Sequence, residues 1–243
     1  GFDNIDVAEA TRRGIVVGNT PGVLTEATAD LTWALILSVA RRIVEGDRMV
    51  RQGRFFGWGP TLLLGADFCG KIIGIIGMGR IGTAVAKRAI GFGMKVLYFD
   101  PQRLKPEKEA EISAQYVSLP EVLREADFVS IHCPLVKDTY HLIGEKELEL
   151  MKPSAYLINV SRGPVVDEQA LVKALKQEKI AGAGLDVYEK EPLLSPGLIE
   201  LPNVVLVPHL GSASIETRNK MAVMTAENLL AVSYTHLTLP TNR

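Results

Sequence analysis

The stretch KIIGIIGMGRIGTAVAKRAIGFGMKVLYFD, residues 71–100, has the pattern of a strand, a glycine turn, a helix and a second strand. The Ile-rich run before the glycines is short enough for a buried parallel strand, and apolar residues recur at helical spacing after them. Gly77, Gly79 and Gly82 have the spacing G-x-G-x-x-G. In this context the first glycine permits a tight turn, the second lets a pyrophosphate approach, and the third lets the helix pack closely on the strand. The stretch therefore predicts a dinucleotide site; the alternative is a βαβ turn with a purely structural role.

The same stretch bears on which dinucleotide is bound. We expect the pyrophosphate at the amino end of the helix, where free N–H groups and the macrodipole favour negative charge. Asp100 ends the second strand, where a carboxylate accepts hydrogen bonds from the adenosine ribose hydroxyls. That carboxylate would repel the 2′-phosphate of NADP, so NAD is favoured, although nearby Arg103 could partly accommodate the phosphate.

Composition and charge exclude several classes of function. The 243 residues are 47% hydrophobic, which is ample for a core, and the formal net charge of -1 provides no basic field for nucleic acid. The longest apolar helical stretch, Leu31 to Ala40, is too short to span a bilayer, and the start shows no signal peptide. Cys69 and Cys133 offer no disulfide framework, which suits a reducing cytoplasm. We therefore expect a cytoplasmic protein with no nucleic-acid or membrane partner.

Apolar runs punctuated by turns predict the rest of the fold. Six candidate strands are expected: the two strands of the stretch above, Phe128 to Cys133, Tyr156 to Val160, Ala181 to Val187, and Val204 to Val207. They alternate with helices or loops, which matches a doubly wound parallel α/β sheet of the Rossmann type.

Other elements are predicted between and before these strands. Helices are expected at Val7 to Arg13, from Thr25 to about Ile43 with a cap from Thr25, Glu26 or Thr28, at Leu119 to Glu125 and at Asp167 to Glu178. Ile15 to Val17 is expected to form a short strand, and Pro101 to Glu111 a polar connection.

The irregular segment Arg51 to Gly70 contains Phe55, Phe56, Trp58 and Phe68. An exposed apolar arm of this kind favours a subunit interface, so a homodimer is expected. The alternative is that the arm packs on its own chain.

Chemically distinctive side chains follow three of the predicted strands. Arg162 follows Tyr156 to Val160, Asp186 ends the next strand, and His209 follows the last one. Glu191 lies in the loop after Asp186, within reach of His209. Because ligands bind beyond the carboxyl ends of parallel strands, these residues are expected at the same edge as the nucleotide.

This set fits hydride transfer to a 2-keto acid. A planar guanidinium, that of Arg162, can hold a carboxylate bidentately and polarise a ketone. His209 could donate the proton, oriented and kept protonated by Glu191, since histidine titrates nearest neutral pH. His132 competes for that role because it also lies near the end of a predicted strand, whereas His141 and His236 do not. Singly, each of these residues is more often a solvated charge or a turn residue than a catalyst.

The chain resembles the D-isomer-specific 2-hydroxyacid dehydrogenase family in the segments GFDNIDV, NTPGVLTEATADLTWALIL, GKIIGIIGMGRIG, INVSRGPVVDEQAL, GAGLDVYEKEP and PNVVLVPHLGSAS. The resemblance implies Arg162 as the substrate-binding arginine, Glu191 as the partner of the catalytic histidine and His209 as the acid/base. It also implies cofactor contacts: the pyrophosphate at Gly79 to Ile81, the ribose at Asp100, the adenosine side at Pro134 and the nicotinamide at Asp186. The full expected cofactor set is Gly77, Gly79, Arg80, Ile81, Gly82, Asp100, Cys133, Pro134, Val160, Asp186, His209 and Gly211, with no metal ligand.

Within the family, the segment GWGPTLLLGADFCGK is most similar to glyoxylate and hydroxypyruvate reductases. The expected function is thus hydride transfer between NAD(P)H and a small 2-keto acid to give the D-2-hydroxy acid. Three alternatives stay open: an enzyme similar to phosphoglycerate dehydrogenases, a dinucleotide-sensing protein similar to corepressors of this family, and a nucleotide-binding fragment without turnover. Formate dehydrogenases are disfavoured, because their resemblance implies a glutamine as the partner of the histidine, whereas this chain has Glu191 at that position.

The resemblance also implies a division into domains. Residues 1–23 would be the remnant of a truncated flavodoxin-like substrate domain, and residues 24–211 the dinucleotide-binding domain. Residues 212–232 would be a C-terminal helix returning to the substrate domain. Residues 233–243, SYTHLTLPTNR, do not resemble the family and are expected to be a non-native tail.

Overall fold

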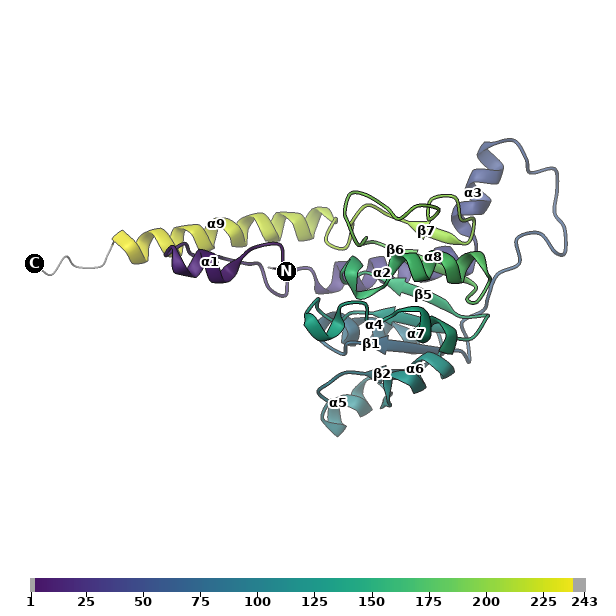
Figure 1. Ribbon diagram of the computed structural model, residues 1–243, viewed down its shortest axis with the longest axis horizontal. Helices are drawn as coiled ribbons and strands as arrows, with labels where there is room; N and C mark the ends of the chain where they lie inside the picture. Colours follow the sequence, from purple (N-terminus) through teal and green to yellow (C-terminus); the bar gives the residue numbers. More distant parts are fainter. Residues whose placement is uncertain (1–2, 238–243) are drawn as a thin grey trace, which may run out of the picture.

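The computed structural model describes residues 3–237, which form a parallel sheet covered by helices on both faces (Figure 1). Within this range the sheet has seven strands in the order β3-β2-β1-β4-β5-β6-β7. Every neighbouring pair is parallel. The strands are β1 (Ile72–Ile76), β2 (Lys95–Phe99), β3 (Ala114–Tyr116), β4 (Phe128–Ile131), β5 (Tyr156–Asn159), β6 (Gly182–Leu185) and β7 (Val204–Leu206).

This order confirms the predicted doubly wound sheet. The chain winds outward from β1 to β3 and then returns to place β4 on the other side of β1. Ligands bind such sheets at this switch point, beyond the carboxyl ends of the strands. The loops after β1 and β4 therefore flank the natural site for a nucleotide.

Two helical layers bury the two faces of the sheet. The helices are α1 (Val7–Arg12), α2 (Thr25–Ala40), α3 (Ile43–Arg51), α4 (Arg80–Gly91), α5 (Pro106–Glu111), α6 (Leu119–Glu125), α7 (Glu145–Leu150), α8 (Glu168–Lys176) and α9 (Ile215–Leu237), with short 3₁₀ turns at Lys137–Thr139 and Gly163–Val165. Helices α2 and α4 pack together on one face, while α6, α7 and α8 cover the other. Trp33 joins the first layer, because its ring stacks on Phe92 at 4.4 Å and its Nε1–H donates to the Val85 carbonyl.

Two segments project from this body in opposite directions (Figure 1). At one end, α3 and the loop after it extend away from the sheet. At the other end, α9 runs out beside α1 and the irregular segment that follows α1. The Asn228 amide of α9 donates to the Asn19 carbonyl at 3.0 Å, which ties these distant parts of the chain together. Across residues 3–237, none of the helices combines the length and apolar character needed to cross a membrane.

Several expectations on the amino-terminal half were wrong. Residues 15–17 form no strand, since both Ile15 and Val16 are exposed and the sheet offers them no edge. The long helix ends at Ala40, because Arg42 adopts a left-handed backbone with φ 52° and α3 starts afresh at Ile43. The start of α2 has no side-chain cap, its N-cap being Leu24.

Beyond Asp100 the structure contains a strand, β3, and two α-helices, α5 and α7, that the apolar pattern did not predict. The expected polar connection after Asp100 includes α5. It leads to the edge strand β3, which was not among the six predicted strands. A strand of three residues at an edge carries too short an apolar pattern to be recognised. The terminal helix α9 spans residues 215–237 rather than 212–232, so it continues into the expected tail. The remainder of that tail, residues 238–243, lies outside the described residues.

Candidate active site

One cavity at the carboxyl edge of the sheet receives the three predicted catalytic side chains. Arg162 follows β5, Glu191 lies in the loop after β6, and His209 follows β7. All three line a cavity of about 810 Å³. The predicted cofactor residues Ile81, Val160, Asp186 and Gly211 line it as well. Sequence spacing alone placed these residues at one edge, and the parallel register brings them to one cavity.

His209 and Glu191 form a hydrogen-bonded pair. Nδ1 of His209 lies 2.9 Å from Oε2 of Glu191, while Oε1 of Glu191 accepts from the Tyr188 backbone N–H at 3.1 Å. Both carboxylate oxygens are thus engaged, which holds the carboxylate toward the ring. Because a carboxylate can only accept, Nδ1 carries the hydrogen in this contact and Nε2 is the nitrogen left for a ligand. The His209 side chain is half exposed, so that nitrogen is accessible.

The backbone at His209 is held in a sparsely populated conformation. Its φ is 55°, a left-handed value that costs free energy for a residue with a Cβ. The His209 N–H donates to the Asp186 carbonyl at 2.9 Å, and the Asp186 carboxylate accepts from the N–H groups of Leu210 (2.5 Å) and Gly211 (2.9 Å). The hydroxyl of Thr28 on α2 donates to the Gly211 carbonyl. These bonds compensate the strain and fix where the imidazole points.

Asp186 therefore supports the histidine loop, a role that sequence reasoning missed. Its side chain is almost fully buried, and burial raises the pKa of the carboxyl, although the two backbone N–H donors act in the opposite direction. A carboxylate has about four acceptor sites, so the predicted contact with a nicotinamide is compatible with this role and stays a prediction.

Arg162 is anchored by two contacts that leave part of its fork free. Nη1 donates to the Ser161 carbonyl at 2.7 Å, and Nε donates to Oδ2 of Asp3 at 2.9 Å. The hydrogen bond from Arg162 lowers the pKa of Asp3. A guanidinium has five N–H donors, so the remaining donors can face a substrate carboxylate in the cavity that Arg162 lines. Asp3 lies in the GFDNIDV motif, but nothing local signalled its pairing with Arg162, 159 residues away.

A tight turn carries Arg162. Asn159, the last residue of β5, donates from its amide to the Arg162 carbonyl at 3.0 Å and accepts from the Ser161 N–H at 3.0 Å. The next residue, Gly163, packs directly on the loop that bears Glu191, since a Cβ there would lie 1.9 Å from the Tyr188 carbonyl. An Asn at a strand end can accept from the backbone N–H two residues on, as Asn159 does from Ser161, and this turn signal could have identified Asn159.

The glycine turn has the geometry expected of a pyrophosphate cradle. Gly77 has φ 94°, and a Cβ on it would lie 2.5 Å from the Cys133 backbone N. A Cβ on Gly82 would lie 2.2 Å from the Gly77 carbonyl oxygen, so the third glycine does allow the helix to pack on the turn. Gly79 is the N-cap of α4 without any side-chain cap, and no atom lies within 4 Å of its Cβ position. The first N–H groups of a helix lack intrahelical partners, so an uncapped end beside open space fits a diphosphate.

Asp100 also belongs to this turn. Its Oδ2 accepts from the Met78 N–H at 2.8 Å and its Oδ1 from the Gln102 N–H at 2.9 Å. The carboxylate thus stiffens the glycine turn, and it retains acceptor sites for the ribose hydroxyls predicted there. Arg80 and Ile81 form the first turn of α4.

The residues after β4 occupy the other side of the nucleotide turn. Cys133 is buried, and burial raises the pKa of its thiol to about 11, so it stays an uncharged lining group. Pro134 is exposed and its carbonyl accepts from the Thr139 hydroxyl. The competing histidine, His132, hydrogen-bonds through Nε2 to the Ser130 hydroxyl, and burial lowers its pKa to about 3. It does not line the cavity and is neutral at ordinary pH, which disfavours it as the proton donor.

His141 lies away from the strand ends, as expected, and has a carboxylate partner. Its Nε2 lies 2.8 Å from Oε1 of Glu189, and its ring stacks on Tyr140 at 4.1 Å. Glu189 lines the same cavity as Glu191, whereas His141 does not. The contact joins the loop after β4 to the loop that bears Glu191. The side chain of His236 lies outside the described part of the chain.

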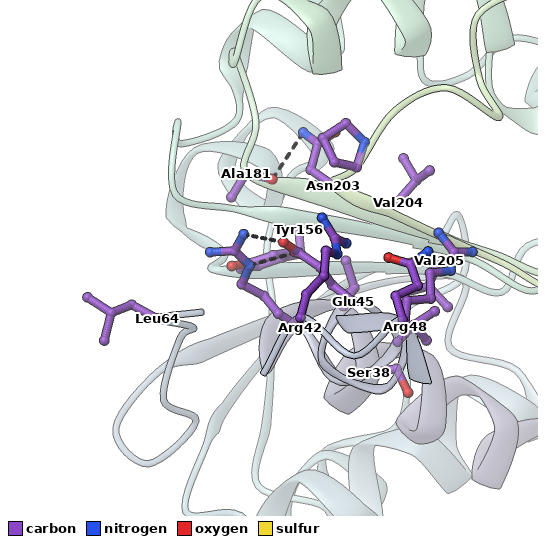
Figure 2. A pocket seen from close by; sticks show the side chains of 15 residues that line it. Ser38, Arg42, Glu45, Arg48, Leu64, Tyr156, Ala181, Asn203, Val204 and Val205 are labelled. Atoms are coloured by element: carbon purple, nitrogen blue, oxygen red, sulfur yellow. Dashed lines mark hydrogen bonds and ion pairs between the residues drawn. The ribbon is translucent and has the colours of Figure 1, made fainter. Parts of the chain in front are cut away.

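A second cavity lies at the opposite edge of the sheet and contains none of the predicted catalytic residues (Figure 2). Its volume is about 530 Å³, and it lies between α3 and the amino ends of β5 and β7. Arg42 and Glu45 form a two-fold hydrogen-bonded ion pair in it, and the Asn203 amide donates to the Ala181 carbonyl. Among the described residues 3–237, it is at the carboxyl edge that the nucleotide turn meets acid, base and guanidinium groups.

Comparisons with known proteins agree with this geometry. A profile described as "D-isomer specific 2-hydroxyacid dehydrogenase, NAD binding domain" matches residues 33–211. The chain is 60% identical over 235 residues to a glyoxylate reductase from Thermococcus litoralis, covering 95% of this chain and 71% of that protein. It is 58% identical over 233 residues to a glyoxylate reductase from Korarchaeum cryptofilum, covering 95% and 70%.

Solved structures show the same likeness. A glyoxylate reductase from Paecilomyes thermophila superposes with a TM-score of 0.86 at 42% identity, over 95% of this chain and 69% of that one. An NADPH-dependent glyoxylate/hydroxypyruvate reductase from Sinorhizobium meliloti, in complex with NADP and malonate, superposes with a TM-score of 0.85 at 38% identity, over 95% and 71%. The profile covers more than half of the chain and the relatives exceed half identity, so this protein belongs to the D-isomer-specific 2-hydroxyacid dehydrogenase family, and its sheet carries that family's nicotinamide-dinucleotide-binding domain.

Proposed function

We propose that this chain catalyses hydride transfer between NAD(P)H and a small 2-keto acid of the glyoxylate or hydroxypyruvate type, giving the D-2-hydroxy acid. The observation that carries the proposal is the His209–Glu191 pair, 2.9 Å apart, in the same cavity as Arg162. An acid/base group and a carboxylate-binding group beside a dinucleotide turn are the parts that a keto-acid reductase needs. The similarity to glyoxylate reductases at 53–60% identity supports the substrate class.

Arg162 is proposed to hold the substrate carboxylate and polarise its ketone. Its contacts with Asp3 and Ser161 fix the guanidinium plane before a substrate arrives. Preorganised donors avoid the entropy cost of ordering a long side chain at the moment of reaction.

His209 is proposed to deliver the proton to the ketone oxygen as the alcohol forms. Glu191 holds Nδ1, so Nε2 is the atom that donates the proton, and the carboxylate stabilises the charged ring before transfer. In the reverse direction the same nitrogen accepts the alcohol proton. Bound at the glycine turn, the nicotinamide would supply or accept the hydride.

NAD is the proposed cofactor in preference to NADP. The Asp100 carboxylate stands at the end of β2 and would repel a 2′-phosphate, while its remaining acceptor sites suit ribose hydroxyls. The Sinorhizobium meliloti relative is NADPH-dependent by its description, so cofactor choice is decided by local residues rather than by the family.

The arm after α3 is proposed to join two copies of the chain. The arm exposes large apolar side chains, among them Phe56 at 93% and Trp58 at 85%. Neighbouring apolar side chains exposed to this extent mark interaction surfaces. Replacing both with Ser should convert a dimer into a monomer in sedimentation-velocity experiments, while a monomeric parent protein would contradict the proposal.

Domain membership and compartment are also proposed. We assign α9 and the segment before α2 to the substrate-domain side, supported by the Asn228–Asn19 contact and by the exposed apolar face of α9 at Leu229 and Leu230. The unpaired Cys69 and Cys133 suit the reducing cytoplasm.

The test is NADH oxidation with a panel of 2-keto acids. Glyoxylate and hydroxypyruvate should be the best substrates, and the glycerate formed from hydroxypyruvate should be the D isomer. His209→Gln should lower turnover about 10²–10⁴-fold, whereas the matched control His141→Gln, which also removes a histidine paired with a carboxylate, should retain it. Undiminished turnover in His209→Gln would refute the assigned acid/base.

A further inference from the structure

A three-membered polar network follows the strand that ends at Asp100. Arg103 donates two hydrogen bonds to the Glu109 carboxylate, from Nε to Oε1 and from Nη2 to Oε2, each 2.9 Å long. The Tyr98 hydroxyl donates to Oε1 of Glu109 at 2.6 Å and accepts from the Leu104 N–H at 2.9 Å. The guanidinium also lies over the Tyr116 ring, 5.5 Å from its centroid. Arg103 is thus held on one side by a carboxylate and on another by an aromatic face.

This network adjoins the expected position of the adenosine ribose. The Asp100 carboxylate accepts from the Gln102 N–H, so the chain folds back on the carboxylate immediately before Arg103. Arg103 lies on this short loop, and the Nε and Nη2 donors of its guanidinium are occupied by Glu109. Its partner, Glu109, comes from α5, an element that the apolar pattern did not predict.

The ion pair between Arg103 and Glu109 stays charged at neutral pH. Hydrogen bonds from Arg103 and then Tyr98 lower the pKa of Glu109 to about 2. Burial, followed by the bond to Glu109, raises the pKa of Tyr98 to about 12. Glu109 therefore stays an acceptor and Tyr98 stays a donor, and the Arg103 fork has a fully charged partner throughout.

NADP differs from NAD by one phosphate on the ribose 2′-oxygen. Glu109 occupies the Nε and Nη2 donors of Arg103, neutralises its charge and fixes its side chain, so only the leftover Nη donors, in the position that Glu109 sets, could meet a phosphate. We propose that Glu109 is a specificity-determining residue, which selects NAD over NADP by withholding Arg103 from the 2′-phosphate. The inference rests on the proposed dinucleotide site and adds a second determinant to the repulsion by Asp100.

Equilibrium binding tests the inference without depending on turnover. Isothermal titration with NAD⁺ and with NADP⁺ would compare the parent chain with Glu109→Gln, Arg103→Ala and the double variant. Glu109→Gln should tighten NADP⁺ binding about tenfold, the effect of one released charge-assisted hydrogen bond. NAD⁺ affinity should change less than about twofold, because NAD⁺ carries a neutral hydroxyl and no phosphate at the 2′ position. The double variant should lose the gain.

Glu111→Gln is the matched control for charge. Glu111 lies on the same helix and pairs with Lys87 at 2.7 Å and Lys108 at 2.9 Å, so its removal changes the net charge equally but leaves Arg103 held. NADP⁺ affinity should not change in this variant. Circular dichroism would check folding, and Glu109→Ala would replace Glu109→Gln if the latter unfolds.

The outcomes separate this inference from the proposed function. Unchanged NADP⁺ affinity in Glu109→Gln, with NAD⁺ still bound, would overturn the inference alone. Weaker NADP⁺ binding in Arg103→Ala would also overturn it, since that result requires Arg103 to contact the phosphate already. Failure of the parent chain to bind NAD⁺ would overturn the dinucleotide site and the inference with it.

Discussion

Replacing Gly163 with Ala should separate the two loops that carry Arg162 and Glu191. A Cβ at Gly163 would lie 1.9 Å from both the carbonyl carbon and oxygen of Tyr188 and 2.4 Å from the Glu189 nitrogen. Real Cβ atoms essentially never approach closer than 3.0 Å. The loops must therefore part by at least about 1.1 Å, the difference between 1.9 and 3.0 Å, and the obstructing atoms are backbone atoms that cannot rotate away.

The displacement sets the expected size of the effect. A misplacement of about 1 Å in an active site can cost about 100-fold in rate, so kcat/KM for glyoxylate should fall by about two orders of magnitude. Overpacking of this kind costs about 1–3 kcal/mol, and rigid backbone puts the cost near the upper end. For a chain of this size that corresponds to a fall in Tm of roughly 6–12 °C. The nucleotide turn is built from other residues, so NAD⁺ affinity should be retained.

The assay combines steady-state kinetics with NADH, thermal unfolding and NAD⁺ titration. Gly91→Ala is the matched control, because no atom lies within 4 Å of its Cβ position at the end of α4. Alanine there should leave activity unchanged and stabilise the protein slightly, by about 0.5–1 kcal/mol. A Gly163→Ala variant with parental kcat/KM, or one that loses NAD⁺ affinity as strongly as activity, would refute the reasoning.

Three further predictions concern the site. His209→Gln should lower kcat about 10²–10⁴-fold while changing KM for the keto acid little, as measured by steady-state kinetics; a large KM change with intact kcat would contradict a proton-donor role. Asp3→Asn should remove a stabilising contact. Because Arg162 lowers the pKa of Asp3, the contribution of Asp3 is present above the ordinary aspartate pKa of 3.8 and is lost as pH falls through the lower folded value. Denaturant unfolding of parent and variant should therefore differ at pH 7 and converge in acid, and a constant difference would argue against the ion pair. Gly79→Ala should leave Tm within about 2 °C, since its Cβ meets open space, but weaken NAD⁺ binding at least about tenfold, as measured by titration; parental affinity would place the pyrophosphate elsewhere.

The backbone plan was predictable because it depends on local patterns. The Ile-rich run, the three glycines and the helical spacing after them define β1, the turn and α4 within a residue or two. The parallel order followed from the alternation of strands and helices. Ile15 to Val17 shows the limit of such reasoning, because an apolar run becomes a strand only where a sheet edge is available to pair with it.

The sequence by itself determined which residue types stand at the carboxyl ends of the strands: a glycine turn, Arg162, Asp186 and His209. Only the tertiary structure decided what each of them contacts. Asp186 supports the His209 loop, and Asp3 anchors Arg162 across 159 residues. Glu109 holds Arg103 from a helix that the pattern did not reveal. The reason is physical: backbone periodicity is a property of neighbouring residues, whereas a side-chain contact a few ångströms long depends on strand register and on loops brought together from distant parts of the chain.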